Sequence, residues 1–158
     1  MEATEKIPRA IGAERSLLGA ALRYPDRGNE LLGLVEPRDY FDEFHQKTWE
    51  YLRDQHRNGG VDIARARRDL QPPESSKGDF TRDYFDDLID EVTTSVHAPA
   101  DAAKIIERRQ LRDRVDHHYT MVQHALNGYT PERIDLENEA ALFDWKLLRA
   151  FRNGGAGS

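Results

Sequence analysis

Apolar residues recur at intervals of three and four along most of the chain, and no stretch alternates as a strand would. This spacing predicts amphipathic α-helices that each bury one stripe. Gly, Pro and capping residues mark where the segments begin and end. The sequence therefore predicts an all-α protein of six to eight helical segments. The clearest cover residues 10–24, 29–35, 41–57, 63–70, 81–94, 100–126 and 131–152.

The segments differ in length along the chain, and this suggests two regions. Short helices with frequent breaks predict a compact head of about five to six helices over residues 10–97. Residues 98–152 contain two long helices around a short turn, Asn127 to Pro131, which predicts an antiparallel helical hairpin. Flexible tails are expected at residues 1–9 and 153–158.

The second hairpin helix carries more apolar surface than one neighbour can cover. Ile134, Ala141, Trp145 and Leu148 form a seam that the first hairpin helix can bury. A second stripe is rotated away from this seam and consists of Ala140, Phe143, Leu147 and Phe151. A helix that is apolar on two sides has to be buried from two directions.

Two arrangements could bury the second stripe. The helix could fold back onto the N-terminal helices of its own chain, or it could pack against another subunit. We favour another subunit, because a large exposed apolar patch usually marks an interface. The first hairpin helix has its own stripe, which continues to Leu126. The predicted protein interface therefore comprises Leu111, Val115, Tyr119, Val122, Ala140, Phe143, Trp145, Leu147, Leu148 and Phe151.

Composition argues against a protein that holds nucleic acid by phosphate neutralisation. The formal net charge is -6, and 33% of residues are charged. Arginines cluster within residues 65–68 and 108–114, but acidic residues lie close by in each case. Such runs are typical of solvated helix faces with i to i+4 ion pairs.

The residues needed for several kinds of catalysis are missing from the sequence. There are no cysteines, which excludes disulfides, thiolate zinc sites and a cysteine nucleophile. No Gly-Lys-Ser/Thr triplet follows the glycine pair Gly59-Gly60, so the chain has no P-loop for ATP hydrolysis. No nucleophile elbow occurs. We expect a non-enzyme that needs no cofactor.

The histidines and paired carboxylates have plain structural interpretations. His117, His118 and His124 share one helix, but their spacing does not suit the i, i+3 or i, i+4 ligands of a metal site, so no metal is expected. His45 and His56 lie on an apolar face and are expected to be packed or hydrogen-bonded. The carboxylates of residues 86–87 and 90–91 are expected on the solvated face of their helix.

The order of short motifs resembles the N-terminal domain of the DnaB family of bacterial replicative hexameric helicases. No single motif is strong, but six occur in the family's order between residues 8 and 125. Two departures occur: residues 75–79 replace a glycine pair, and Asp101-Ala102 replaces Asn-Ile. The matching segments are residues 13–20 (AERSLLGA), 37–41 (PRDYF), 44–49 (FHQKTW), 61–63 (VDI), 84–88 (YFDDL) and 95–109.

The resemblance implies a helical head with a hairpin that pairs between subunits. In the family, such pairs build a trimeric collar of dimers that contacts primase and helicase loaders. Helicase activity does not carry over, since the family's ATPase domain would follow beyond a linker. An alternative is a free-standing replication regulator that binds helicase, or single-stranded DNA through residues 63–70, Arg108 and Arg109. A cytoplasmic location is expected, because the apolar run at residues 17–22 is too short to span a bilayer.

Overall fold

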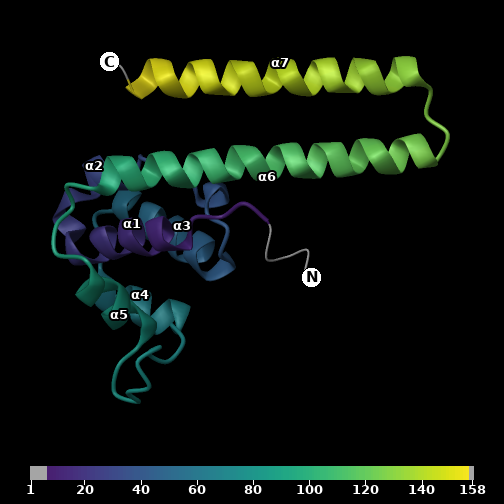
Figure 1. Cartoon of the computed structure of the whole chain (residues 1–158). Helices are drawn as coiled ribbons and strands as arrows, with labels where there is room; N and C mark the ends of the chain where they lie inside the picture. Colours follow the sequence, from purple (N-terminus) through teal and green to yellow (C-terminus); the bar gives the residue numbers. More distant parts are fainter. Residues whose placement is uncertain (1–6, 157–158) are drawn as a thin grey trace. The chain divides into compact units, whose positions relative to one another are not determined.

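The computed structural model describes the backbone of residues 7–156 and the side chains of residues 7–150. In this part of the chain there are helices but no strands, apart from one isolated bridge between Glu74 and Asp83. The all-α prediction is confirmed. Figure 1 shows the helices α1 (Ile11–Arg23), α2 (Gly28–Leu31), α3 (Glu43–Arg57), α4 (Ile63–Leu70), α5 (Tyr84–Glu91), α6 (Ala98–Leu126) and α7 (Pro131–Ala156), with 3₁₀ turns at Pro25–Arg27 and Pro37–Asp39.

The chain divides into two compact units, residues 1–109 and residues 110–158. We call the first unit the head and the second the hairpin. The first turns of α6 belong to the head, where Ala98, Ala102 and Ile105 are buried in its core. The remainder of α6 and all of α7 form the hairpin.

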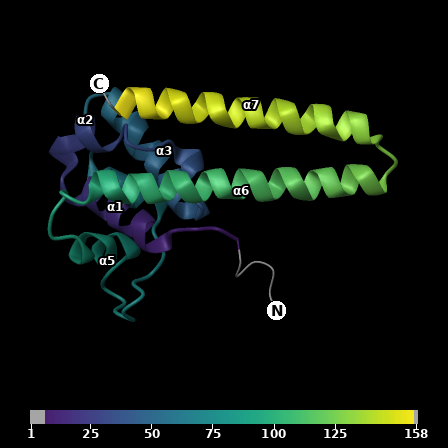
Figure 2. The same ribbon diagram turned by 45° about the horizontal axis from the view of Figure 1, so that its top comes forward.

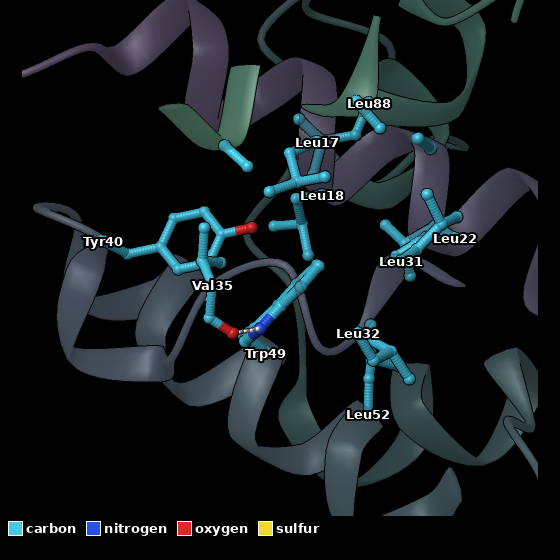
Figure 3. Packing of buried hydrophobic residues seen from close by; sticks show 14 of the residues in the cluster. Leu17, Leu18, Leu22, Leu31, Leu32, Val35, Tyr40, Trp49, Leu52 and Leu88 are labelled. Carbon is cyan, nitrogen blue, oxygen red and sulfur yellow. Dashed lines mark hydrogen bonds between the residues drawn. The ribbon is translucent and has the colours of Figure 1, made fainter. Parts of the chain in front are cut away.

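The core of the head forms where α1 packs against α5, and where α3 lies beside the 3₁₀ turn at Pro37–Asp39 and α4. Leu17 and Leu18 on α1 are fully buried, as are Trp49 on α3 and Leu88 on α5. The indole of Trp49 donates a 3.0 Å hydrogen bond to the carbonyl oxygen of Val35, so its one polar atom is satisfied inside the core (Figure 3). These contacts give the head a continuous apolar interior.

A glycine allows the close contact between α1 and α5. A Cβ atom built at Gly19 would lie 2.4 Å from the carbonyl oxygen of Leu88 and 2.7 Å from a methyl group of Val92. Both distances are far below van der Waals contact. The family-like Leu-Gly-Ala sequence of α1 therefore has a packing role, because any larger residue at Gly19 would force the two helices apart.

Capping side chains fix the starts of the head helices. Asp42 accepts a hydrogen bond from the amide of His45 at the start of α3, and Asp62 accepts one from the amide of Arg65 at the start of α4. Helix α5 is shorter than the predicted helix over residues 81–94. Asp83 caps it in a capping box, while Thr81 bonds to Asp79 in the preceding loop.

In the hairpin, α7 runs antiparallel to α6, as Figures 1 and 2 show. The turn between them contains Gly128 with a φ of 93°, a conformation that favours glycine. The hydroxyl of Thr130 accepts a 3.2 Å hydrogen bond from the amide of Arg133 and caps α7. Helix α7 continues to Ala156, beyond its predicted end near Arg152. Residues 1–6 and 157–158 of the expected tails, and the side chain of Phe151, lie outside the described part.

Candidate protein–protein interface

The two hairpin helices face each other through polar side chains. His117 Nε2 on α6 lies 2.6 Å from Asn138 Oδ1 on α7. Two helical turns along α6 from His117, His124 Nδ1 lies 3.3 Å from Glu137 Oε2. Met121 sits between the two histidines in sequence and is buried. We call this set of facing residues the seam, and its polar character is the first property of the site.

Trp145 belongs to the seam. Its ring lies edge-on to His117 with the ring centroids 5.4 Å apart, and the guanidinium of Arg114 is 4.5 Å from the indole centroid. The side chain is half-buried by these two neighbours from α6. Trp145 was predicted as an interface residue, but much of its surface is already covered by its own hairpin.

The apolar residues of α6 point away from the seam. Val115 precedes His117 by two residues, and Val122 precedes His124 by two; two residues correspond to about 160° around an α-helix. Their side chains therefore lie on nearly the opposite side of the helix. We call this set the α6 stripe, with exposed fractions of 39% at Leu111, 50% at Val115, 67% at Tyr119, 56% at Val122 and 76% at Leu126.

Helix α7 repeats this arrangement. Phe143 precedes Trp145 by two residues and is 66% exposed, while Leu147 follows Trp145 by two and is 58% exposed. Ala140 is exposed on the same side. Leu136 also belongs here, seven residues before Phe143, and was missed although the spacing could have revealed it. The α7 stripe is therefore Leu136, Ala140, Phe143 and Leu147.

The remaining hairpin predictions have mixed outcomes. Ile134 and Ala141 are half-buried, as expected for seam positions, but Leu148 is 43% exposed. Phe151 cannot be placed, because its side chain is outside the described residues. The residues of α6 that cover the seam are Arg114, His117, Met121 and His124. The seam therefore buries little apolar surface, and the residues of both stripes lie outside the contact between α6 and α7.

A second polar cluster lies in the interior of the head. Glu14 and His45 are both about 1% exposed, and their side chains are 2.9 Å apart. Glu14 also accepts hydrogen bonds from the backbone amides of Phe41 and Asp42, and His45 Nε2 lies 2.8 Å from the hydroxyl of Tyr84. The prediction that His45 is packed and hydrogen-bonded is confirmed. The cluster ties α1, α3 and α5 together.

One carboxylate prediction is wrong. Asp87 was expected on the solvated face of its helix, but it is fully buried. It accepts hydrogen bonds from the hydroxyls of Ser75 and Ser76 and from the amide of Ser76, at 2.7–2.8 Å. The Ser75 hydrogen bond is the largest cause that lowers the pKa of Asp87 to about 2. Asp87 therefore fixes the loop before α5.

The arginine clusters of the head are already paired with acids. Arg67 bonds to Asp83 at 2.6 Å and to Asp86 at 2.8 Å, and these bonds raise the pKa of its guanidinium. Arg65 and Arg68 both lie close to Asp69, and Arg108 pairs with Glu107. Arg67 joins α4 to the start of α5, whereas the other pairs are local and exposed and contribute little to stability. Because these cations are paired with acids, they do not form an open basic surface.

No group of three His, Asp or Glu side chains in residues 7–150 is arranged to hold a metal ion. Within that same part of the chain, no helix has the length and apolar character needed to cross a membrane.

Comparisons with known proteins agree with the architecture. The family model described as the DnaB-like helicase N terminal domain matches residues 6–108. A search of curated proteins finds no match. Among solved structures, the chain is similar to the N-terminal domain of DnaB helicase from Mycobacterium tuberculosis, with 26% identity and a TM-score of 0.71, covering 89% of this chain and 99% of that one. With its helical head matched over most of its length, the chain belongs to the DnaB-like helicase N-terminal domain family.

Proposed function

We propose that this chain is a non-catalytic oligomerisation and protein-docking domain of DNA replication that self-associates through its hairpin. The observation that carries the proposal is the pair of exposed apolar stripes on α6 and α7. Each stripe faces away from the seam. The hairpin's own pairing therefore leaves the stripes uncovered.

The free energy available from covering the stripes is large. Burying a Val, Leu or Phe side chain contributes roughly 1.5–3 kcal/mol relative to leaving it exposed. The α6 stripe alone has four such residues. Together with Tyr119 they make five positions, separated by four, four, three and four residues along the helix. This is the spacing of a helix that packs against another helix over several turns.

A second copy of the chain is the partner that best fits this surface. Every copy carries the same stripe, so a two-fold arrangement lets each stripe cover its counterpart. The described stripe residues are all uncharged, which removes any like-charge repulsion within the contact itself. The prediction from the DnaB resemblance, that hairpins pair between subunits, agrees with this arrangement.

The replication setting follows from the family. A self-associated helicase N-terminal domain would present its heads for docking to helicase, primase or a helicase loader. The alternative, direct binding of single-stranded DNA through residues 63–70, has less support. Arg65, Arg67 and Arg68 are paired with carboxylates, and phosphate binding would have to break those pairs.

The self-association proposal is tested by placing a charge in a stripe. Val122→Glu puts a carboxylate in the centre of the α6 stripe, and we expect it to weaken association at least about tenfold, equivalent to about 1.4 kcal/mol. Light scattering after size-exclusion chromatography measures the molar mass over a concentration series. Phe143→Glu tests the α7 stripe in the same way.

Thr120→Glu is the matched control. Thr120 is exposed on the same helix and lies two residues before Val122. The substitution therefore introduces the same charge on a different face of α6. It should leave the molar mass unchanged. A monomer for the unmodified chain at high concentration would contradict the proposal. The proposal would also be contradicted if the Val122→Glu and Phe143→Glu proteins associated as strongly as the Thr120→Glu protein.

A further inference from the structure

A cavity of about 230 Å³ opens in the head where the end of α3 meets the region of α2. Gly28 and Leu32 contribute its apolar lining, together with Gly33 just beyond. Arg53 and Arg57 contribute basic side chains from the last turns of α3. The cavity belongs entirely to the head and contains no residue of either hairpin stripe.

The charge of the lining is unbalanced. Two arginines and His56 line the cavity, and none of the lining residues is acidic. Arg57 pairs with Asp54, which lies outside the lining. Within the described residues, the half-buried side chain of Arg53 has no hydrogen-bond or ion-pair partner. An arginine side chain whose donors are unused is an available binding group for a carboxylate or phosphate.

One wall of the cavity is held in place by close contacts. His56 Nε2 lies 2.7 Å from Asn29 Oδ1, which joins α3 to α2. A Cβ atom at Gly28 would come within 2.7 Å of His56 Nδ1, so only glycine lets the imidazole pack this closely. The position of the wall therefore does not depend on a ligand.

The size of the cavity limits what it can hold. Ligand pockets for drug-sized molecules have volumes of roughly 300–1,000 Å³. This cavity is smaller and suits one side chain. A bidentate Arg–carboxylate pair is among the strongest and most directional contacts available to such a side chain. The apolar floor at Leu32 suits an aliphatic neighbour of that carboxylate.

We propose that this cavity docks an acidic side chain of a partner protein, with the carboxylate on Arg53 and Arg57 and an adjacent aliphatic residue on Leu32. The inference goes beyond self-association, since it concerns a surface on the head and needs no contact of the hairpin. It identifies the partner by its chemistry, an Asp or Glu followed by an aliphatic residue.

A polyanion fits the surroundings less well than a single carboxylate. Nucleic acid binds through a row of unpaired cations that follows the phosphates. The basic residues of the neighbouring helix α4 are paired, including Arg65 and Arg68 with Asp69. The positive region is therefore local, and the chain as a whole carries a net charge of -6.

Peptide titration of the full chain tests the inference. The probe is the capped peptide acetyl-Ala-Glu-Leu-Ala-amide. The control peptide differs from it only by Gln in place of Glu. Two-dimensional NMR follows the backbone amides of Gly28 and Gly33 and the Nε–H group of Arg53. We expect saturable shifts of these signals with the Glu peptide at millimolar concentration. The Gln peptide should bind at least about tenfold more weakly, the equivalent of about 1.4 kcal/mol.

Two variants test the cavity by different means. Arg53→Ala removes the unpaired charge, and Gly33→Leu adds a side chain at the lining of the cavity while retaining every charge. A Cβ atom at Gly33 meets nothing within 4 Å, and its φ is not positive, so the fold should accept a side chain there. Both variants should weaken binding of the Glu peptide about tenfold or more. Arg68→Ala, which removes an exposed arginine outside the lining, is the control and should bind normally.

Several results would overturn the inference. These are the absence of saturable shifts, equal affinity for the Glu and Gln peptides, or full affinity in both cavity variants. Tighter binding of inorganic phosphate than of the Glu peptide would assign the cavity to a free anion instead. Preference for an uncapped Ala-Ala-Leu peptide would assign it to a C-terminal carboxylate. None of these results depends on molar mass, so they are separate from the test of self-association.

Discussion

The head and the hairpin are both made of amphipathic helices, but they bury their apolar residues to very different extents. In the head, Leu17, Leu18 and Trp49 are fully buried. In the hairpin, Met121 is the one large apolar side chain within residues 110–150 that is classed as buried. Trp145 is half-buried in the seam, but most of the other large apolar residues of the hairpin are exposed.

The difference follows from the number of neighbours that each helix has. Helix α1 contacts α2, α3 and α5, so its apolar stripe is covered within the unit. Each hairpin helix has one antiparallel neighbour within its own unit, and this neighbour contacts it through the polar seam of His117, His124, Glu137 and Asn138. The head therefore has an internal source of stability, while the hairpin stripes can gain theirs from association.

The largest expected effect comes from the core of the head. Trp49→Ala should lower the free energy of unfolding by about 3–5 kcal/mol, because it leaves a cavity and removes the donor to the Val35 carbonyl. Urea denaturation followed by circular dichroism measures this. Phe80→Ala is the control: Phe80 is 87% exposed, so its loss should change stability by less than about 0.5 kcal/mol. Equal effects of the two substitutions would contradict the assignment of the core.

An intermediate effect is expected from acid titration of the head. The hydrogen bonds of Ser75 and Ser76 lower the pKa of Asp87 from 3.8 to about 2. A carboxylate with a lowered pKa in the folded state stabilises that state above the pKa it has when unfolded. This contribution is fully present near neutral pH and is lost as the pH falls from about 4 to about 2. Melting temperatures measured by circular dichroism across this range should show the loss.

Asp87→Asn isolates this contribution. The amide cannot ionise, so the variant should melt at a lower temperature near pH 7 and approach the unmodified protein near pH 2. Asp26→Asn changes an exposed carboxylate in the head and should keep the acid dependence of the unmodified chain. Parallel curves for the unmodified chain and Asp87→Asn would show that the loop is not held by an ionised carboxylate.

The helices of the head were predictable because their signals are local. Apolar spacing places α1 and α3, and Asp62 identifies the start of α4 through its capping side chain. The ends of α5 were missed, since Asp83 and not an earlier residue caps the helix. The burial of Asp87 was missed for a different reason. Its partners Ser75 and Ser76 lie in a loop whose path the periodicity of a helix does not specify.

The candidate interface was predicted in outline but not in detail. Apolar spacing revealed both stripes, since the residues of each stripe lie on one side of a helix. It did not reveal which side faces the neighbouring helix. The side of α6 that faces α7 carries His117 and His124. Pairing depends on cross-helix partners such as Asn138, which are distant in sequence.

The smallest expected effect comes from the seam of the hairpin. Met121→Ala should lower stability by about 1 kcal/mol, below the 2–5 kcal/mol typical of buried Met→Ala changes, because a seam of two helices can close or admit water. Hydrogen exchange should show faster exchange at amides of residues 110–150 and unchanged protection in α1 and α3. Met121→Leu keeps the volume and should have little effect. A loss as large as that of Trp49→Ala would mean that the hairpin has a core of its own, and the contrast between the two units would then no longer hold.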